Sequence, residues 1–362
     1  MKQQIKNILI DLYQKIQERK QIKGELLYFK DLSKNIQIPP LTQQQEKEIK
    51  QYFKNSIGFD TTTSFHAYYS FLNGIFSCKY LPFRLYYHKI IPALYDLRLI
   101  NSYDDKNFMN KLFPEVLQPY CYIKNINGHY YHNEKPISRQ KAISLCQNIP
   151  LAIIKPTLYT SGGNGVKRIS IQSGKVGEQS IEDVFDEYKM NFVIQEVINQ
   201  HELLNRLNPT SLQTFRVVTY WRNEEVVLVS ALLRIGREGS FVDNGTAGGY
   251  CCGCTVEGKL KKYAYAFHPT KKVTKTDNGV LLENYALPHF TDIIETAKRL
   301  HYEVPHLPLV GWDLTVNKEG HVVLIEINPT FGIDILQLTN GPAFGEYTDE
   351  ILAKVNSFYR KK

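Results

Sequence analysis

The chain has 362 residues, a formal net charge of +8 and an apolar share of 43%. This length suits two or three packed subdomains, and the absence of an uncharged apolar run of about 18 residues argues against a membrane span. The N-terminal segment MKQQIKNILIDLYQKIQERK is charged throughout, so we do not expect a secretory signal. Six cysteines form no regular framework, which favours a reducing cytoplasm.

The positive charge is spread along the chain and is not gathered in one basic arm. A basic balance fits nucleic acid, but it also suits an enzyme that handles anionic substrates such as nucleotides or carboxylates. We expect small-molecule substrates and no nucleic-acid partner.

Residues 1–56 are predicted to be helical. Apolar residues recur at helical spacing in the first segment, and PPLTQQQEKEIKQYFK opens a second helix with Thr42 as its N-cap. Residues 57–103 are dense in aromatic side chains, which build either a core or a partner surface. In NSYDDKNFMNKLFP, Ser102 is expected to cap a short helix.

From residue 120 onward the sequence predicts short strands and turns, with an Asn-Gly turn at 127–128 and a helix that begins near Ser138. Helices are predicted in SIEDVFDEYK and PHFTDIIETAKRLH. The strand patterns are LAIIKP, VKRISIQ, NFVIQEVI, FRVVTYW, EEVVLVSALLRIG and HVVLIEINP. Many linkers are too short for helical crossovers, so we expect an α+β fold with a largely antiparallel sheet.

The glycine-rich stretch SGGNGVKRIS at 161–170 lies between two of these strands. It is not a Walker loop, because Val166 separates Gly165 from Lys167 and no helix follows. Taken alone, it is either an ordinary hairpin or a loop over phosphates.

A second hairpin is predicted in GWDLTVNKEGHVVLIEINPTFGID. Glu326 and Asn328 share one face of its second strand, and Asp313 lies on the first strand, opposite them. The alternate residues Val323, Ile325 and Ile327 are expected in the core. Two carboxylates and an amide oxygen suit Mg²⁺, although a solvated outer face is the alternative.

The order of these elements resembles the ATP-grasp superfamily, which includes D-alanine–D-alanine ligase. The sugar-transfer-associated branch of that superfamily is the most similar. The resemblance covers roughly residues 60–345 and is carried by FHAYYSFLNG, LPFRLYYHKIIPAL, DDKN, QTFRVV and DNGTAGG. It implies two α+β subdomains that clasp ATP, at 101–190 with a glycine-rich lid and at 191–362 with a magnesium site. A mainly helical region at 1–100, for substrate or partner binding, precedes them.

The resemblance also implies roles for individual residues. ATP contacts fall on Lys106 and Lys155, on the lid residues Ser161, Gly162, Gly163 and Gly165, on the adenine hinge Glu196, Val197 and Ile198, and on Glu202 at the ribose. Catalytic cations fall on Lys167, Arg216 and Arg234, and the Mg²⁺ ligands on Asp313, Glu326 and Asn328.

GGYCCGCTVEG departs from the family pattern by placing cysteines after the double glycine. Cys251, Cys252 and Cys254 lack a histidine or a second cysteine pair at metal-ligand spacing, so buried small side chains are the favoured interpretation over zinc or a nucleophile. Two further features stay open between a structural role and substrate contact: His66, and the turn with Asn244, Gly248 and Gly249.

By resemblance, the expected activity is an ATP-dependent carboxylate–amine ligase that forms an acyl phosphate. A sugar acid of surface polysaccharide synthesis is the suggested substrate class. An ATP-grasp phosphotransferase and a non-catalytic nucleotide-binding scaffold of a glycosyltransferase complex are the alternatives. Homo-oligomer formation is left open.

Overall fold

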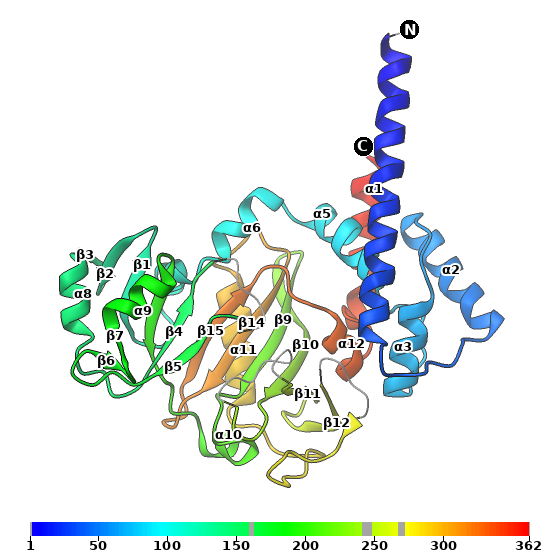
Figure 1. Cartoon of the computed structure of the whole chain (residues 1–362). Helices are drawn as coiled ribbons and strands as arrows, with labels where there is room; N and C mark the ends of the chain where they lie inside the picture. Colours follow the sequence, from blue (N-terminus) through cyan, green and yellow to red (C-terminus); the bar gives the residue numbers. More distant parts are fainter. Residues whose placement is uncertain (1, 159–162, 241–247, 267–271, 362) are drawn as a thin grey trace. The chain divides into compact units, whose positions relative to one another are not determined.

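The computed structural model describes residues 2–158, 163–240, 248–266 and 272–361 (Figure 1). The chain divides into two units, of which the first comprises Met1–Asp96 and Gly332–Lys362 and the second Leu97–Phe267 and Val273–Phe331. Helices and antiparallel sheets together confirm the predicted α+β class. The C-terminal residues from Gly332 thus belong with the N-terminal ones, and not with the preceding hairpin as the division at residue 191 supposed.

The first unit is helical. Its elements are α1 (Lys2–Leu32), α2 (Gln43–Ile57), α3 (Ser64–Asn73), α4 (Phe83–Leu85), the π-helix η1 (Tyr86–Ile90), α5 (Ile91–Leu94), α12 (Asp334–Asn340), the short 3₁₀ turn η4 (Gly345–Tyr347) and α13 (Thr348–Arg360). Thr42 caps α2 as predicted, in a capping box with Gln45, and Gly58 ends this helix at φ 72°.

A buried carboxylate ties three helices of the first unit together. Asp334 of α12 accepts hydrogen bonds from the hydroxyls of Tyr28 in α1 (2.8 Å) and Tyr69 in α3 (2.5 Å). Burial raises the pKa of Asp334, and the two hydroxyls satisfy its oxygens inside the core.

The second unit begins with the helix α6 (Leu97–Tyr103), the 3₁₀ turn η2 (Lys106–Phe108) and the helix α7 (Met109–Leu112). The expected cap at Ser102 is wrong, because Ser102 lies inside α6. Asp105 caps the next turn instead, since its side chain accepts a hydrogen bond from the backbone N–H of Asn107 at 2.9 Å.

A six-stranded antiparallel sheet follows in the order β3-β2-β1-β8-β4-β5. Its strands are β1 (Cys121–Ile126), β2 (His129–His132), β3 (Lys135–Ile137), β4 (Ala152–Pro156), β5 (Lys167–Ile169) and β8 (Phe192–Glu196). The predicted turn at Asn127–Gly128 joins β1 to β2, with both residues at positive φ. The helices α8 (Arg139–Leu145), capped by Ser138, and α9 (Ile181–Tyr188) bury one face of this sheet, and the small ribbon β6 (Lys175–Val176) and β7 (Gln179–Ser180) precedes α9.

The second sheet has seven strands in the order β13-β12-β11-β10-β9-β14-β15. These are β9 (Thr214–Arg222), β10 (Glu225–Ile235), β11 (Tyr250–Cys254), β12 (Leu260–Ala266), β13 (Lys272–Val273), β14 (Leu309–Val316) and β15 (Val322–Asn328). The helix α11 (Phe290–His301) packs across β9, β10, β14 and β15, and α10 (Glu202–Leu207) precedes β9. The face that α11 leaves open carries the polar residues discussed below.

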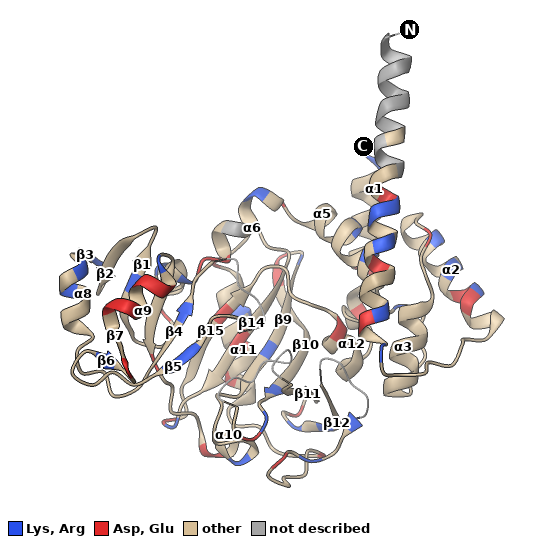
Figure 2. Ribbon diagram, viewed as in Figure 1, with Lys and Arg blue, Asp and Glu red and all other residues tan. Residues whose placement is uncertain are grey.

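Basic and acidic residues are interspersed along residues 16–32 of α1 and over both sheets (Figure 2). Among the described residues, no helix combines the length and the apolar character needed to cross a membrane.

The Asp334 cluster makes a stability prediction. Asp334→Ala leaves two buried tyrosine hydroxyls without an acceptor, and we expect the free energy of unfolding to fall by about 3 kcal/mol in urea denaturation. Asp349→Ala is the control, because Asp349 also accepts from a tyrosine, Tyr52, but its side chain is 61% exposed. Its loss should stay below about 1 kcal/mol. Equal losses in the two variants would contradict this account.

Candidate functional site

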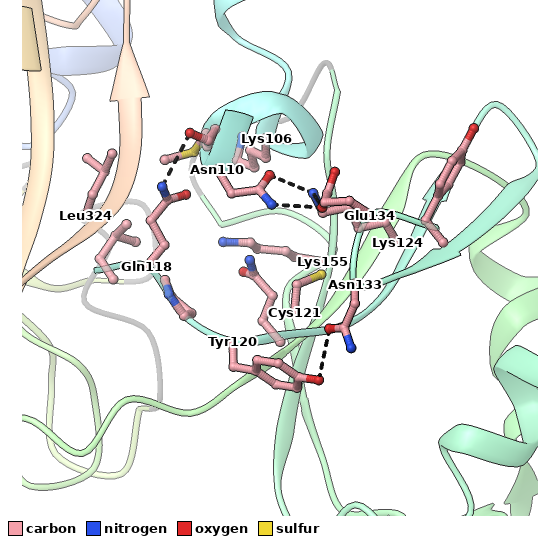
Figure 3. A pocket seen from close by; sticks show the side chains of 15 residues that line it. Lys106, Asn110, Gln118, Tyr120, Cys121, Lys124, Asn133, Glu134, Lys155 and Leu324 are labelled. Atoms are coloured by element: carbon pink, nitrogen blue, oxygen red, sulfur yellow. Dashed lines mark hydrogen bonds and ion pairs between the residues drawn. The ribbon is translucent and has the colours of Figure 1, made fainter. Parts of the chain in front are cut away.

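A cavity of about 380 Å³ opens in the second unit, between the six-stranded sheet and the middle of β15 (Figure 3). A volume of this size lies within the range of small-molecule sites. Its walls combine cations with apolar and amide side chains, among them Lys106, Lys124, Lys155, Gln195, Leu324 and Ile325.

The apolar wall depends on a bulge in β15. Asp313 pairs with Glu326, as predicted, and Leu314 pairs with Leu324, so Ile325 is an extra residue between them. Val323 and Ile327 are buried as expected, but Ile325 is only half-buried and lines the cavity. The strict alternation assumed from the sequence therefore fails at this one residue.

Asp313 is held between two arginines. Its side chain is 1% exposed and bonds Arg216 of β9 at 2.5 and 3.0 Å and Arg234 of β10 at 2.9 Å. Burial alone raises the pKa of Asp313, but the two guanidinium groups lower it below its ordinary value, with a smaller contribution from the Asn328 amide. The two arginines that were predicted to be catalytic therefore bond a carboxylate that was predicted to bind the metal.

Gly311 makes room for this arrangement. It lies two residues before Asp313 on the same face of β14, where a Cβ atom would stand 3.2 Å from Cδ of Arg216 and 2.9 Å from Cβ of Phe331. A larger residue here would therefore require Phe331, and to a smaller extent the stem of Arg216, to shift.

The second predicted carboxylate pairs with the first predicted ATP lysine. Lys106 Nζ lies 2.8 Å from Oε1 of Glu326, and the lysine side chain is 9% exposed. Burial lowers the pKa of Lys106, but the charge of Glu326 raises it overall, so the lysine stays protonated.

Lys155 differs from the other cavity lysines. Its side chain extends into the cavity (Figure 3), and its Nζ makes no hydrogen bond or ion pair with a residue that the structure describes. Burial lowers its pKa, against a smaller opposite effect of Glu326. An ammonium group in this state is a ready receptor for an anion.

The glycine-rich loop is described from Gly163 onward, and Ser161 and Gly162 lie outside the described residues. Gly163 and Gly165 both have φ near 75°, and a Cβ on Gly165 would stand 2.8 Å from Cγ of Pro156. Lys167 pairs with Ile154 in the ladder and so faces the helix-covered side, where its Nζ bonds Glu187 at 2.5 Å. The structure does not bring Lys167 to the cavity.

The residues expected at the adenine and ribose lie at the end of β8. Glu196 is the last residue of the strand, and its carboxylate accepts a hydrogen bond from the backbone N–H of Tyr120 at 2.8 Å. Val197 and Ile198 follow, beyond the ladder. Glu202 is exposed and pairs with Arg206 one helical turn on.

Several residues in the cavity wall, or close to the predicted site residues, were missed by the sequence analysis. Lys124, Asn110 and Glu134 form one hydrogen-bonded cluster in the wall. Asp104 lies near Lys106 and Glu326, and burial raises its pKa. Arg168 of β5 pairs with Ile153 of β4, so its side chain lies on the same face of the sheet as those of Ile153 and Lys155. In the sequence, only the DDKN motif indicates Asp104, and only the alternation of residues in β5 indicates Arg168.

Other predicted features are placed apart from the cavity. Cys251 and Cys252 are buried, as the favoured interpretation predicts, whereas Cys254 is half-buried. Burial raises the pKa of Cys252 to about 12. Among the described residues, His, Cys, Asp and Glu side chains form no group of three that would hold a metal. His66 is buried in the first unit with its Nε2 3.2 Å from the Cys78 carbonyl, and Asn244 is outside the described residues.

Asp313, Glu326 and Asn328 could supply part of the coordination shell of a magnesium ion, but not all of it. Asp313, Glu326 and Asn328 offer hard oxygen ligands from neighbouring positions of β14 and β15. Two carboxylates are too few to complete a coordination shell, and both are paired with cations. A divalent ion here would need further oxygens, such as those of a phosphate chain that also occupies the cations.

The two antiparallel sheets, with this set of cations and oxygen ligands, define the ATP-grasp fold. Residues 86–352 match the family model described as sugar-transfer associated ATP-grasp, which is most of the chain. The protein belongs to this family, and the resemblance drawn from its sequence motifs is confirmed. No curated protein sequence matches it.

Solved structures with a similar arrangement include three synthetases and ligases. D-cycloserine synthetase DcsG has a TM-score of 0.42 and 11% identity, over 74% of each chain. D-alanyl-alanine synthetase A from Vibrio cholerae has a TM-score of 0.39 and 15% identity, over 71% of this chain and 65% of that one. L-amino acid ligase from Bacillus licheniformis has a TM-score of 0.36 and 14% identity, over 67% and 48%. These values are too low to say anything about activity.

The arginine-bound carboxylate predicts a pH-dependent loss of stability. Asp313→Asn removes the buried carboxylate charge that Arg216 and Arg234 share, and we expect the free energy of unfolding at pH 7 to fall by about 3 kcal/mol. Because the folded pKa of Asp313 lies below its ordinary value of 3.8, its contribution is present above that pH and is lost as the pH falls through the folded pKa. The difference between wild type and variant should therefore shrink below pH 3.8.

Urea denaturation at several pH values measures this difference. Asp277→Asn is the matched control, since Asp277 bonds Arg237 at 2.6 Å but Arg237 is 45% exposed. Its effect should stay below about 1 kcal/mol. A loss in Asp313→Asn that does not change with pH would contradict the assignment to the carboxylate charge.

Proposed function

We propose that the protein is an ATP-dependent carboxylate–amine ligase that works through an acyl phosphate. The cavity is its nucleotide site, with Lys106 and Lys155 at the phosphates, the glycine-rich loop as lid, and Glu196, Val197 and Ile198 along the adenine. Asp313, Glu326 and Asn328 hold Mg²⁺, which neutralises phosphate charge when it is bound. The family description suggests a sugar-linked acid or amine as substrate.

The observation that carries this proposal is the pairing of three cations, Lys106, Arg216 and Arg234, with the neighbouring carboxylates Asp313 and Glu326. Lys106 and Lys155 also line the cavity. Lys155 adds a half-buried ammonium group that bonds none of the described residues. A cluster of half-buried cations favours an anionic ligand such as a nucleotide phosphate chain. Phosphoryl transfer depends mostly on positioning and electrostatic stabilisation, which this set supplies without a side-chain nucleophile.

When a ligand binds, the ion pairs of the unliganded site must be replaced by contacts with that ligand. The cations proposed to receive phosphate oxygens are paired with the carboxylates proposed to hold the metal. A phosphate chain alone would leave the carboxylates unpaired, and a metal alone would leave the cations unpaired. Nucleotide and metal are therefore expected to bind together, and Arg216 and Arg234 then face the transferred group.

A phosphotransferase that passes phosphate to a hydroxyl would use the same cations, and a scaffold would bind ATP without turnover. The intact pairing of Asp313 and Glu326 with basic partners supports a working site over a scaffold.

The direct test is ADP release with Mg²⁺-ATP against sugar acids and amino acids, each offered with and without an amine, for wild type and Glu326→Ala. We expect one acid–amine pair to raise ADP release at least about tenfold and Glu326→Ala to abolish the increase. Mass spectrometry should find an amide and one free phosphate per ADP. A phosphorylated hydroxyl would instead establish the phosphotransferase, and ATP binding without stimulated turnover would favour the scaffold.

Lys155→Met separates binding from stability. The ammonium of Lys155 is buried without a bonded partner, and its lowered pKa means that the folded state carries a penalty for this charge at every pH below that pKa. We expect Lys155→Met to keep or raise the melting temperature at pH 7 while ATP affinity falls about tenfold or more, measured by calorimetry. Lys141→Met, an exposed lysine of α8, should change neither quantity. Unchanged ATP affinity in Lys155→Met would contradict its placement at the phosphates.

A further inference from the structure

Lys124 is the third lysine of the cavity wall, and its bonds differ from those of the other two. Its side chain lies in β1 and is almost fully buried. Nζ donates to the Asn107 carbonyl at 3.0 Å, to Oδ1 of Asn110 at 2.6 Å and to the Glu134 carboxylate. An ammonium group has three protons, so all of its donors are used. Figure 3 shows Lys124 beside Asn110 and Glu134.

Two of the three acceptors of Lys124 lie on the segment that carries Lys106. Asn107 is the next residue in η2, and Asn110 follows in the first turn of α7. Glu134, from the β2–β3 turn, closes the cluster by accepting from Nδ2 of Asn110 at 2.8 Å. Burial raises the pKa of Glu134, but its bonds with Lys124 and Asn110 lower it overall, so the carboxylate stays charged.

The other side of this segment is fastened to β4. The backbone N–H of Lys106 donates to the Thr157 carbonyl at 3.3 Å, and Nδ2 of Asn107 donates to Oγ1 of Thr157 at 2.7 Å. Thr157 comes two residues after Lys155. The turn is therefore held from β1 by Lys124 and from β4 by Thr157, and these two attachments set where Lys106 stands relative to Lys155.

We propose that Lys124 is a positioning residue, which holds the η2–α7 segment so that Lys106 faces the phosphates, and that it is not itself a ligand of the nucleotide. This inference rests on the proposed nucleotide site for its functional consequence. Its structural part, the fixing of residues 106–112 by Lys124, holds whatever the ligand is.

A double-mutant cycle of Lys124→Met and Lys106→Met distinguishes the roles. Methionine keeps most of the apolar stem and removes the ammonium group. Calorimetry with adenosine, ADP and ATP separates the base from the phosphates. If Lys124 acts through Lys106, Lys124→Met lowers ATP and ADP affinity about tenfold, leaves adenosine affinity unchanged, and adds almost nothing in the Lys106→Met background.

Two other outcomes overturn the proposal. Losses of ATP affinity that add in the double variant would mean that Lys124 contacts phosphate directly. Equal losses for adenosine and ATP would mean a general structural role. Lys111→Met is the matched control, because Lys111 lies in α7 and reaches the same Glu134 carboxylate at 3.5 Å, but is 54% exposed. It should leave all three affinities unchanged.

Amide hydrogen exchange tests the inference without any nucleotide. Lys124→Met should speed exchange at residues 107–112 about tenfold, with β8 and β14 unchanged, whereas Lys111→Met should not. Unchanged exchange in that segment would overturn the positioning role even if ATP binds. Failure of wild type to bind any nucleotide would overturn the proposed function, while the exchange result would still decide whether Lys124 fixes the segment.

Discussion

The strand register of the second unit depends on one constraint. Opposite charges that are removed from water must lie next to one another. Asp313, Arg216 and Arg234 come from three neighbouring strands, β14, β9 and β10. A slip of one residue in either ladder would turn one partner to the other face of the sheet and leave a charge buried alone. The requirement to pair these charges thus fixes the register of β14, β9 and β10, and β14 in turn pairs with β15, which carries Glu326 and Asn328.

The same constraint gives the cavity lysines different roles. Lys124 is saturated by three acceptors, Lys106 has one carboxylate as partner, and Lys155 has no bonded partner among the described residues. A side chain that is already satisfied resists movement, whereas a cation with a single exchangeable partner, or with none, is available to an incoming anion. One residue type therefore supplies both the frame of the cavity and its receptor groups.

Sequence reasoning reached what depends on local rules. The capping box at Thr42, the turn at Asn127–Gly128, the helix start at Ser138 and the pairing of Asp313 with Glu326 all follow from short-range patterns. It missed what depends on tertiary contact. A bulge at Ile325 has no sequence signature in this hairpin, and the cluster of Lys124 with Glu134 joins elements that carry no shared motif. The direction of Lys167 also required the ladder partner of β5, which its alternation alone does not identify.

A comparison of two buried aspartates in this chain indicates that the charged residues of the site are not there for stability alone. In the first unit, Asp334 is satisfied by two neutral tyrosine hydroxyls. Asp313 is satisfied instead by two guanidinium groups, and the stem of one of them, Arg216, packs close to Gly311 together with Phe331. Buried ion pairs add little net stability, because the cost of removing both charges from water offsets their attraction. If stability alone mattered, neutral hydroxyl donors such as those around Asp334 would be favoured at Asp313 as well. The arginines beside Asp313, with Lys106 beside Glu326, are therefore better explained by a ligand that needs their charge than by the fold that holds them.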